Sequence, residues 1–200
     1  MGALDRTSPT RIIRGLSVFL RAAEREDIAD FLRWLNDDAT ARFLALRSPL
    51  SRPLEERWFE RMLEMQGKDA YHFVICRLDD ERAIGTIGFY EVDRDNGSAA
   101  VGIAIGELDQ VGRGLGTDAL NALVDFGFGE LRLERIWLDV YAFNTRAVRS
   151  YEKAGFTLEG RLRRARFGRG EFHDVLRMSI LRDEWAASDR PRSWQLEAEP

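Results

Sequence analysis

A glycine-rich turn between an apolar strand and an amphipathic helix limits the folds open to this chain more than any other sequence feature. The turn covers residues 110–117 and holds three glycines in eight positions. Glycine adopts the left-handed backbone of a tight turn, and its missing Cβ lets a ligand approach the main chain. Backbone N–H groups at the electropositive start of the following helix can converge on an anion. The sequence therefore predicts a phosphate-binding turn in a fold that mixes helices and strands.

The segments around this turn have a clear order. Apolar residues recur at helical spacing over 115–131, and residues 135–141 alternate as a strand does. Asn144 is a good N-cap for a second helix, which Gly155 ends. The strand before the turn, near 99–106, has one face made only of Ala and Gly. Such a face can admit the backbone of a ligand, although small side chains can equally pack under a neighbouring element.

Two kinds of nucleotide site compete for this order. Residues 114–119 match G-x-G-x-x-G/A, and Asp139 ends the next strand, where dinucleotide-binding units place a ribose-binding acid. The context does not favour that reading, because the motif lies past mid-chain and only one helix and a hairpin follow. This is too little chain for a doubly wound sheet. A Rossmann-type oxidoreductase is therefore the weakest of the functional hypotheses.

The second kind of site follows from two motifs at a fixed separation. One helix and one strand after the turn, the chain carries an N…A…Y-x-x-x-G-F segment: Asn144, Ala147, Tyr151, Gly155 and Phe156. The pair resembles the acetyl-CoA signature of the GNAT superfamily of N-acetyltransferases, whose turn reads R/Q-x-x-G-x-G/A. Gly114 and Gly116 match, whereas Val111 stands at the Arg/Gln position and Gln110 comes one residue early. The resemblance extends over residues 14–183 and is strongest to the ribosomal-protein alanine and polyamine N-acetyltransferase branches.

The resemblance implies an α+β domain of the GNAT fold at residues 14–185. This fold has a mixed central sheet of six to seven strands, splayed at the acetyl-CoA site and flanked by four to five helices. Residues 1–13 would be an N-terminal extension. Residues 186–200 carry Pro, Ser and Glu with few apolar anchors and are predicted to form a flexible C-terminal tail. Earlier strands are expected near 16–21, 71–78 and 83–92, later ones near 161–167 and 173–181, and the first helices near 27–35, 38–46 and 55–65.

The resemblance implies transfer of an acetyl group from acetyl-CoA to a primary amine, by direct attack in a ternary complex. The turn would bind the pyrophosphate, and the main chain of the preceding strand would bind pantetheine like an added strand. No metal is expected. The predicted cofactor-binding residues are Ile103, Ile105, Val111, Gly112, Arg113, Gly114, Leu115, Gly116, Thr117, Asn144, Ala147 and Tyr151.

Tyr151 is the predicted general acid. The reaction needs a neutral amine, a stabilised oxyanion and a proton for the departing thiolate. Tyr151 lies seven residues after Asn144, so both side chains should share one face of the helix. A phenol with an ordinary pKa near 10 stays protonated at neutral pH. The resemblance implies the same role, although a tyrosine packed in the core would look alike in sequence.

The general base is left open among three acids. Asp139 leads, because a catalytic glutamate in the ribosomal-protein alanine N-acetyltransferases matches its position. Its side chain is one methylene shorter, which favours proton transfer through a bridging water. Glu107 is the second candidate and Glu91 the third. Many members of the family have no dedicated base, and each acid could equally be a surface group.

The acceptor pocket is expected where the first helices overhang the acetyl group. Trp34, Phe43 and Trp58 are candidate walls, although large apolar residues at helical spacing more often belong to the core. Asp37 and Asp38 could bind a cationic amine, although a solvated helix terminus would carry the same residues, and Glu91 is a further candidate substrate residue. A protein N-terminus, a polyamine and a small-molecule amine all remain open as acceptors.

Composition indicates which other kinds of site and partner to expect. The chain has two histidines without metal-ligand spacing and one cysteine, so we expect neither a metal site nor an intrachain disulfide, and a cytoplasmic location. No apolar run approaches a membrane span. A net charge of −4 does not favour nucleic acid despite the arginines of 161–169. The expected partners are acetyl-CoA, an amine acceptor and a second copy in a homodimer. A non-catalytic acyl-CoA-binding or interaction domain on the same fold is the main alternative.

Overall fold

The computed structural model describes residues 12–196, and its centre is one eight-stranded sheet in the order β1-β2-β3-β4-β5-β6-β8-β7. All neighbouring strands are antiparallel except β5 and β6, which run parallel. Seven of the strands were expected from the sequence, whereas β1 has only two residues and was not. The strands are β1 Ile13–Arg14, β2 Val18–Ala22, β3 Tyr71–Arg77, β4 Ala83–Asp93, β5 Ser98–Ile105, β6 Arg135–Tyr141, β7 Thr157–Gly168 and β8 Glu171–Leu181.

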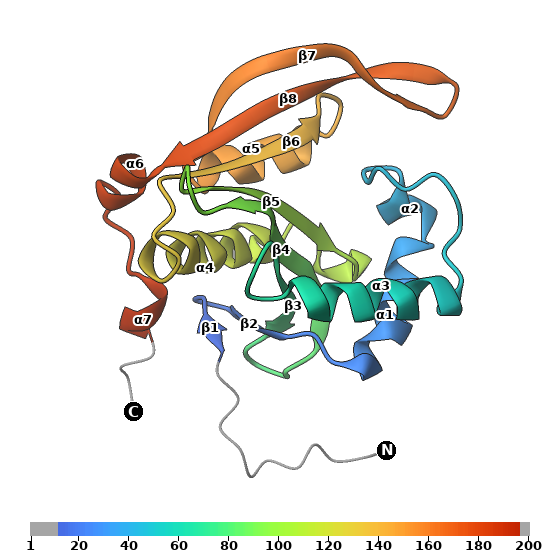
Figure 1. Ribbon diagram of the computed structural model, residues 1–200, viewed down its shortest axis with the longest axis horizontal. Helices are drawn as coiled ribbons and strands as arrows, with labels where there is room; N and C mark the ends of the chain where they lie inside the picture. The colour runs from blue at the N-terminus through green and yellow to red at the C-terminus, as the bar shows by residue number, and fades with distance from the viewer. Residues whose placement is uncertain (1–11, 197–200) are drawn as a thin grey trace.

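Helices cover both faces of this sheet. In Figure 1, α4 and α5 lie on one face and α1 and α3 on the other, while the β7–β8 hairpin extends over the end where α2 lies. The described helices are α1 Ile28–Leu35, α2 Asp38–Ala41, α3 Arg52–Met65, α4 Leu115–Gly129, α5 Thr145–Lys153, α6 Arg182–Ala186 and α7 Ser193–Leu196.

Helix α2 is shorter than the stretch expected over 38–46. The Asp37 side chain accepts a hydrogen bond from the Ala39 backbone N–H at 2.8 Å, which caps the first turn. Only Thr40 of the helix is buried, so little packing stabilises further turns beyond Ala41.

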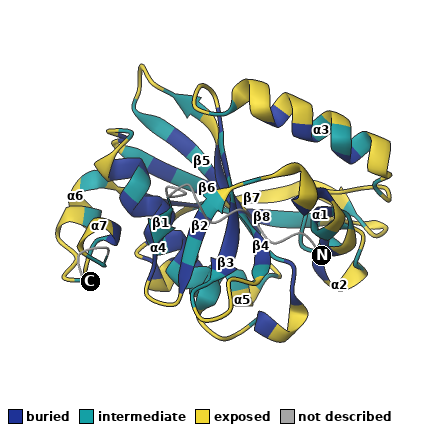
Figure 2. Ribbon diagram, turned by 90° about the horizontal axis from the view of Figure 1, so that it is seen from below, coloured by how far each residue is buried: buried dark blue, intermediate teal, exposed yellow. Residues whose placement is uncertain are grey.

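The main core lies between the sheet and α4. Its largest fully buried side chains include Phe89 from β4 and Phe128 from α4. In Figure 2 the buried residues gather in the strands and along α4, whereas α3 is exposed along most of its outer side. A second cluster, on the opposite face, joins Phe31 and Trp34 of α1 to the buried Val74 of β3. The predicted amphipathic pattern therefore holds for both helices.

The small-residue face of β5 packs partly under large side chains. A Cβ added at Gly102 would lie 2.8 Å from the Tyr90 ring, and one at Gly106 would lie 2.0 Å from the Trp34 ring. Both contacts leave no room for a side chain. Close packing thus accounts for these two glycines without any ligand.

Strands β5 and β6 separate after three residue pairs. They are paired only from Ser98 opposite Arg135 to Ala100 opposite Trp137. Beyond this point the strands diverge, and β6 continues its pairing with β8 as far as Tyr141. The main chain of β5 from Val101 onwards therefore has no β6 partner. This is the splayed sheet that the sequence led us to expect.

The segment after α6 is held against α4 by one buried carboxylate, Asp125, which is 1% exposed. It accepts hydrogen bonds from Trp185 Nε1 at 2.7 Å, from the Arg190 guanidinium at 2.7 and 2.8 Å, and from the Ser193 backbone N–H at 2.8 Å. Residues 186–196 thus differ from the flexible tail expected over 186–200. Composition alone did not reveal an anchor more than 60 residues away in sequence. Residues 197–200, and 1–11 of the expected extension, lie outside the described part of the chain.

Over residues 12–196, no helix has the length and apolar character needed to cross a membrane.

Candidate active site

A cavity of about 500 Å³ opens where β5 and β6 diverge. The glycine-rich turn and the start of α4 form one wall, α5 forms a second, and α2 with the residues just after it forms a third. The cavity therefore connects the two faces of the sheet. We call it the transfer cavity.

The turn meets the cavity with its backbone. Gly112 and Gly114 both have φ of +83°, and Gly114 is the N-cap of α4. A Cβ at either position would meet nothing within 4 Å, so glycine is needed there for its backbone conformation and not because of crowding. Arg113 and Leu115 do not line the cavity, and Leu115 packs against the core instead. The turn residues that line it are Gln110, Val111, Gly112, Gly114, Gly116 and Thr117.

Strand β5 and helix α5 complete the expected cofactor wall. Ile103 and Ile105 line the cavity in the part of β5 that β6 leaves unpaired. The Asn144 side chain accepts a hydrogen bond from the Ala147 backbone N–H at 3.2 Å and so caps α5, and both residues line the cavity. The Asn144 amide N–H₂ group takes no part in this cap and is left to bind elsewhere.

Two hydroxyls join α4 to α5 at this wall. Thr117 Oγ1 and Ser150 Oγ lie 2.8 Å apart, and both residues line the cavity. This bond couples the first turn of α4 to α5.

Tyr151 lies on α5 and lines the transfer cavity while being only 8% exposed. Its ring packs against Phe156, with centroids 6.0 Å apart. Burial raises the pKa of Tyr151 to about 12, because desolvation disfavours the phenolate. The phenol therefore stays protonated throughout the neutral and moderately alkaline range.

Asp139 lines the same cavity from β6. Arg177, directly opposite on β8, donates two hydrogen bonds of 2.9 Å to its carboxylate, one from Nε and one from an Nη. The Arg177 guanidinium also lies over the Trp137 ring, 4.3 Å from its centroid. The carboxylate is thus held in one orientation. Arg177 was not predicted from the sequence, since its role depends on the strand register.

Glu107 has a different setting and does not line the cavity. Its carboxylate is 6% exposed and accepts hydrogen bonds from Trp34 Nε1 at 2.7 Å, from Arg33 and from Arg82. Burial raises the pKa of Glu107, but the bonds from Arg33 and Trp34 outweigh it and lower the pKa overall. Glu107, the second candidate base, and Trp34, a candidate wall of the acceptor pocket, therefore belong to one cluster with Arg33 and Arg82 beside α1. Neither Glu107 nor Trp34 lines the transfer cavity.

The remaining candidate substrate residues are dispersed. Phe43, just after α2, lines the transfer cavity. Asp37 does not line it and caps α2. Glu91 is exposed, has φ of +50°, and lies where the β4–β5 pairing is irregular, outside the cavity lining. The structure thus brings Phe43 to Tyr151 and Asp139, but not Asp37 or Glu91.

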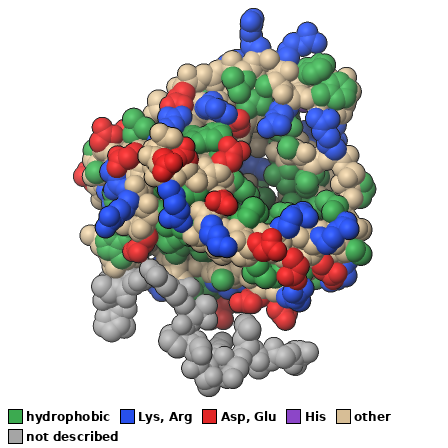
Figure 3. Space-filling view, in the orientation of Figure 1, with side chains coloured by type: hydrophobic (Ala, Val, Ile, Leu, Met, Phe, Trp, Pro, Cys, Tyr) green, Lys and Arg blue, Asp and Glu red, His purple; other side chains and the backbone are tan. Residues whose placement is uncertain are grey.

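A second cavity of about 850 Å³ lies between residues 35–49 and the β7–β8 hairpin. Tyr141 and Arg166, together with Leu44 and Ala45, line both cavities, so the two cavities lie next to each other. We call the second one the hairpin cavity. Figure 3 shows a hollow on this side of the molecule, with hydrophobic side chains inside it and Lys or Arg side chains around it.

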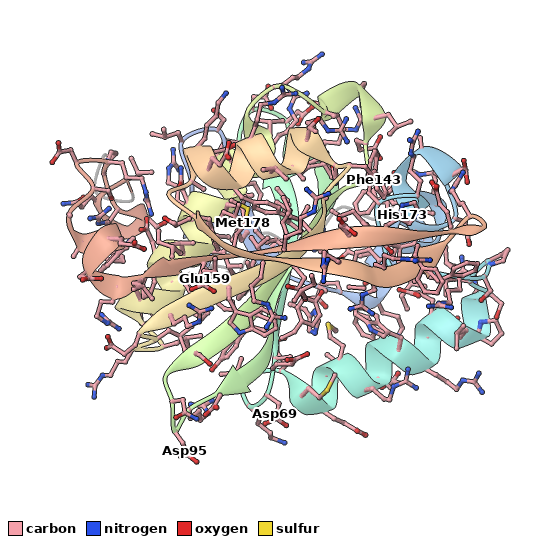
Figure 4. The ribbon with its side chains drawn as sticks, turned by 90° about the horizontal axis from the view of Figure 1, so that it is seen from above. Asp69, Asp95, Phe143, Glu159, His173 and Met178 are labelled. Carbon is pink, nitrogen blue, oxygen red and sulfur yellow. The ribbon has the colours of Figure 1, made fainter. Side chains whose placement is uncertain are left out.

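Aromatic side chains form one wall of the hairpin cavity. The rings of Tyr141 and Phe143 stack with centroids 5.0 Å apart, and Phe143 packs against His173 at 4.9 Å. Figure 4 shows Phe143 close to His173, which belongs to the β7–β8 hairpin. The sequence analysis singled out none of these three. All three residues lie near the ends of β6 and β8. The sequence does not show that these ends are neighbours, because this depends on how the two strands pair.

Comparison with known proteins agrees with this geometry. The chain matches the acetyltransferase (GNAT) domain family over residues 17–157. It is 31% identical over 171 residues to the SPbeta prophage-derived uncharacterized N-acetyltransferase YokL of Bacillus subtilis, covering 86% of this chain and 93% of that protein. It is 32% identical over 172 residues to a spermidine N(1)-acetyltransferase of Vibrio cholerae, covering 83% and 94%.

Among solved structures, the spermidine N-acetyltransferase from Vibrio cholerae in complex with CoA and spermine is similar to this fold. The TM-score is 0.79 at 27% identity, over 85% of this chain and 98% of that one. The chain belongs to the GNAT family of acetyltransferases. The protein is accordingly an acetyl-CoA-dependent N-acetyltransferase that acts on a primary amine.

These findings confirm the predicted family, fold and reaction. The mixed, mostly antiparallel sheet contradicts the Rossmann hypothesis, which requires a doubly wound parallel sheet. Within residues 12–196, no three His, Cys, Asp or Glu side chains are grouped so that they could hold a metal ion.

Proposed function

We propose that acetyl transfer takes place in the transfer cavity, with acetyl-CoA on the α4–α5 side and the amine entering past α2. One observation carries the proposal: the glycine turn, Tyr151 and Asp139 line one continuous cavity at the splay. The amine nitrogen would attack the thioester carbonyl, forming the C–N bond. The C–S bond would then break as the thiolate leaves.

The donor side would be bound mainly by backbone groups. The first N–H groups of α4, after Gly114, are suited to the pyrophosphate. The unpaired main chain at Ile103 and Ile105 is suited to the amides of pantetheine. Arg146, Arg149 and Lys153 of α5 also line the cavity. These cations, which the sequence analysis did not assign to the cofactor, would add attraction for the phosphates.

Tyr151 would supply the proton that the departing thiolate needs. The burial that raises its pKa to about 12 keeps the phenol protonated and ready to donate. A phenolate left after transfer would regain its proton from water. Tyr151 is the best-placed acid because it is both buried and in contact with the cavity.

Asp139 would orient the incoming amine and take its proton through a bridging water. Two of its lone-pair directions are occupied by Arg177, which leaves the others for water or an ammonium group. Glu107 is less suited to this role, because three donors already bind its carboxylate.

The test of this proposal is Tyr151→Phe, which keeps the ring against Phe156 and removes only the hydroxyl. General acid catalysis is typically worth about 10²–10⁴, so we expect kcat to fall at least about tenfold with the KM for acetyl-CoA little changed. Tyr71→Phe is the matched control, because the Tyr71 hydroxyl lies outside the cavity and makes only two long hydrogen bonds, to the Gly67 carbonyl at 3.4 Å and from Arg94 at 3.3 Å.

The pH profile of the native enzyme gives an independent check. Because the phenol is protonated up to about pH 12, kcat should show no alkaline decline near pH 10, where an ordinary tyrosine titrates. Unchanged single-turnover rates in Tyr151→Phe would rule out the acid role.

We also propose that the protein works in the cytoplasm as a homo-oligomer. A spermidine N-acetyltransferase from Vibrio cholerae with a TM-score of 0.74 to this chain, at 27% identity, is dodecameric, which supports assembly beyond the predicted homodimer. The one cysteine, Cys76, is a buried free thiol, as suits a reducing compartment. Light scattering of the purified protein measures the copy number directly.

A further inference from the structure

The charges of the hairpin cavity are mostly positive and mostly unpaired. Four arginines line it, against two carboxylates, Asp38 and Glu171. Arg169 forms an ion pair with Asp38. Among residues 12–196, no carboxylate pairs with the other three arginines. These are Arg42, Arg47 and Arg166.

The transfer cavity offers little compensation for these cations. Asp139 is the one carboxylate in its lining, and Arg177 occupies two of its lone-pair directions, so the cavity has a carboxylate for one ammonium group and none for a second. Glu171 of the hairpin cavity lies 3.9 Å from the His173 ring. A polycation in the two cavities would therefore face several unpaired guanidinium groups. Like charges in one site repel, so such a site discriminates against polycations.

The two cavities meet at shared side chains, with Asp139 on one side and the unpaired arginines of the hairpin cavity on the other. Tyr141 and Arg166 belong to both linings, and the stacked rings of Tyr141 and Phe143 form a wall beside them. An amine at Asp139 would thus have an aromatic surface beside it and Arg166 beyond it. Guanidinium groups bind carboxylates with two parallel hydrogen bonds, which suits an anion at this end.

We propose that the acceptor is a primary amine that also carries a carboxylate. Its ammonium group binds at Asp139 and its carboxylate binds Arg166, while Arg42 and Arg47 of the hairpin-cavity lining add positive charge. The inference rests on the proposed function, because it assigns the acceptor side of the same site. It separates this chain from the relatives that are named for spermidine, a polycation. The carboxylate can belong to a free amino acid or to an acidic residue near a peptide N-terminus.

The experiment measures thiol release from acetyl-CoA by the full chain with acceptors matched in shape. Phenylalanine is paired with 2-phenylethylamine, and leucine with 3-methylbutylamine, so that each pair differs by one carboxylate. Ala-Glu-Glu is paired with Ala-Lys-Lys, and spermidine represents the polycations. We expect kcat/KM at least about tenfold higher for the more acidic member of the preferred pair. Preference within the amino acid pairs or within the peptide pair identifies the source of the carboxylate.

The variant Arg166→Ala tests the residue that carries the inference. It should lower kcat/KM about tenfold for the acidic acceptor and less than twofold for its decarboxylated or lysine-containing partner. Arg163→Ala, on the same strand but in neither cavity lining, should change neither value. Equal losses for both partners in Arg166→Ala would overturn the inference.

The set of acceptors tests the preference for a carboxylate separately from acetyl transfer itself. Turnover of spermidine or of the decarboxylated amines above the acidic acceptors would overturn the inference and leave the proposed function standing. Absence of thiol release with every amine, in protein that binds acetyl-CoA, would overturn both. A preference for the acidic acceptors supports both.

Discussion

The two sides of the transfer cavity are constructed in different ways. The proposed donor side consists of β5, the glycine turn and α5, and most of the contacts we propose there come from backbone N–H and C=O groups within residues 103–151. The acceptor side consists of side chains from residues 35–49 and from the β7–β8 hairpin, more than 100 residues further along the chain. Backbone geometry depends on a few residues that permit it, whereas side-chain surfaces change with every substitution.

This contrast suggests where specificity can vary. The donor side must bind one cofactor, and its glycines and N-caps are required by conformation. The acceptor side can change its charge without any change of fold. Among the matched relatives some are named for spermidine and others for aminoglycosides, while the backbone of a spermidine enzyme superposes on this one with a TM-score of 0.79.

The largest effect is expected from Gly114→Val on the donor side. Valine at φ of +83° is strained, at a cost of about 1–2 kcal/mol, and its Cβ would project into the open space above the turn. We expect the dissociation constant of acetyl-CoA to rise at least about tenfold. Isothermal titration calorimetry measures it directly.

A matched control for Gly114→Val is Gly160→Ala in β7. A Cβ there also meets nothing within 4 Å, but Gly160 has no positive φ and lies outside both cavity linings. Its acetyl-CoA affinity should equal that of the native protein. Normal cofactor affinity in a folded Gly114→Val variant would mean that the donor side does not depend on its backbone geometry.

Asp139→Asn, at the junction of the two sides, should have the next largest effect. We expect kcat to fall about tenfold at neutral pH, because the amide cannot accept the amine proton. The loss should shrink as pH rises, since a growing fraction of the amine is then neutral without help from the protein. Initial rates across the pH range at saturating acetyl-CoA test this. A loss that is equal at all pH values would assign Asp139 to positioning alone.

The smallest effect is expected from Phe43→Leu on the acceptor side. The Phe43 ring lies 6.0 Å from Phe143, and aromatic pairs are worth about 0.5–1.5 kcal/mol beyond their buried area. The KM for the acceptor should rise about threefold, with the KM for acetyl-CoA unchanged.

Phe172→Leu is the control for this prediction, because Phe172 is exposed on the hairpin and lines neither cavity. Equal increases in both KM values for Phe43→Leu would show that the two sides are not separable.

The sequence itself determined most of the fold and the local elements that form the proposed donor side. The glycines of the turn, the Asn144 cap and the spacing to Tyr151 are local requirements of backbone geometry, so residue types within about 40 positions express them. The bounds of β6 and the end of α5 at Gly155, where φ is +93°, follow from the same kind of signal.

Tertiary structure alone decided which side chains meet. Strand register put Arg177 on Asp139, and the fold of α1 against β5 enclosed Glu107 between Arg33, Arg82 and Trp34. Closure of the hairpin over α2 brought Arg166 to the acceptor side, and Asp125 bound the segment beyond α6. These contacts join segments that are far apart in the chain. No local pattern encodes them, because each depends on two segments whose relative placement only the packed core establishes.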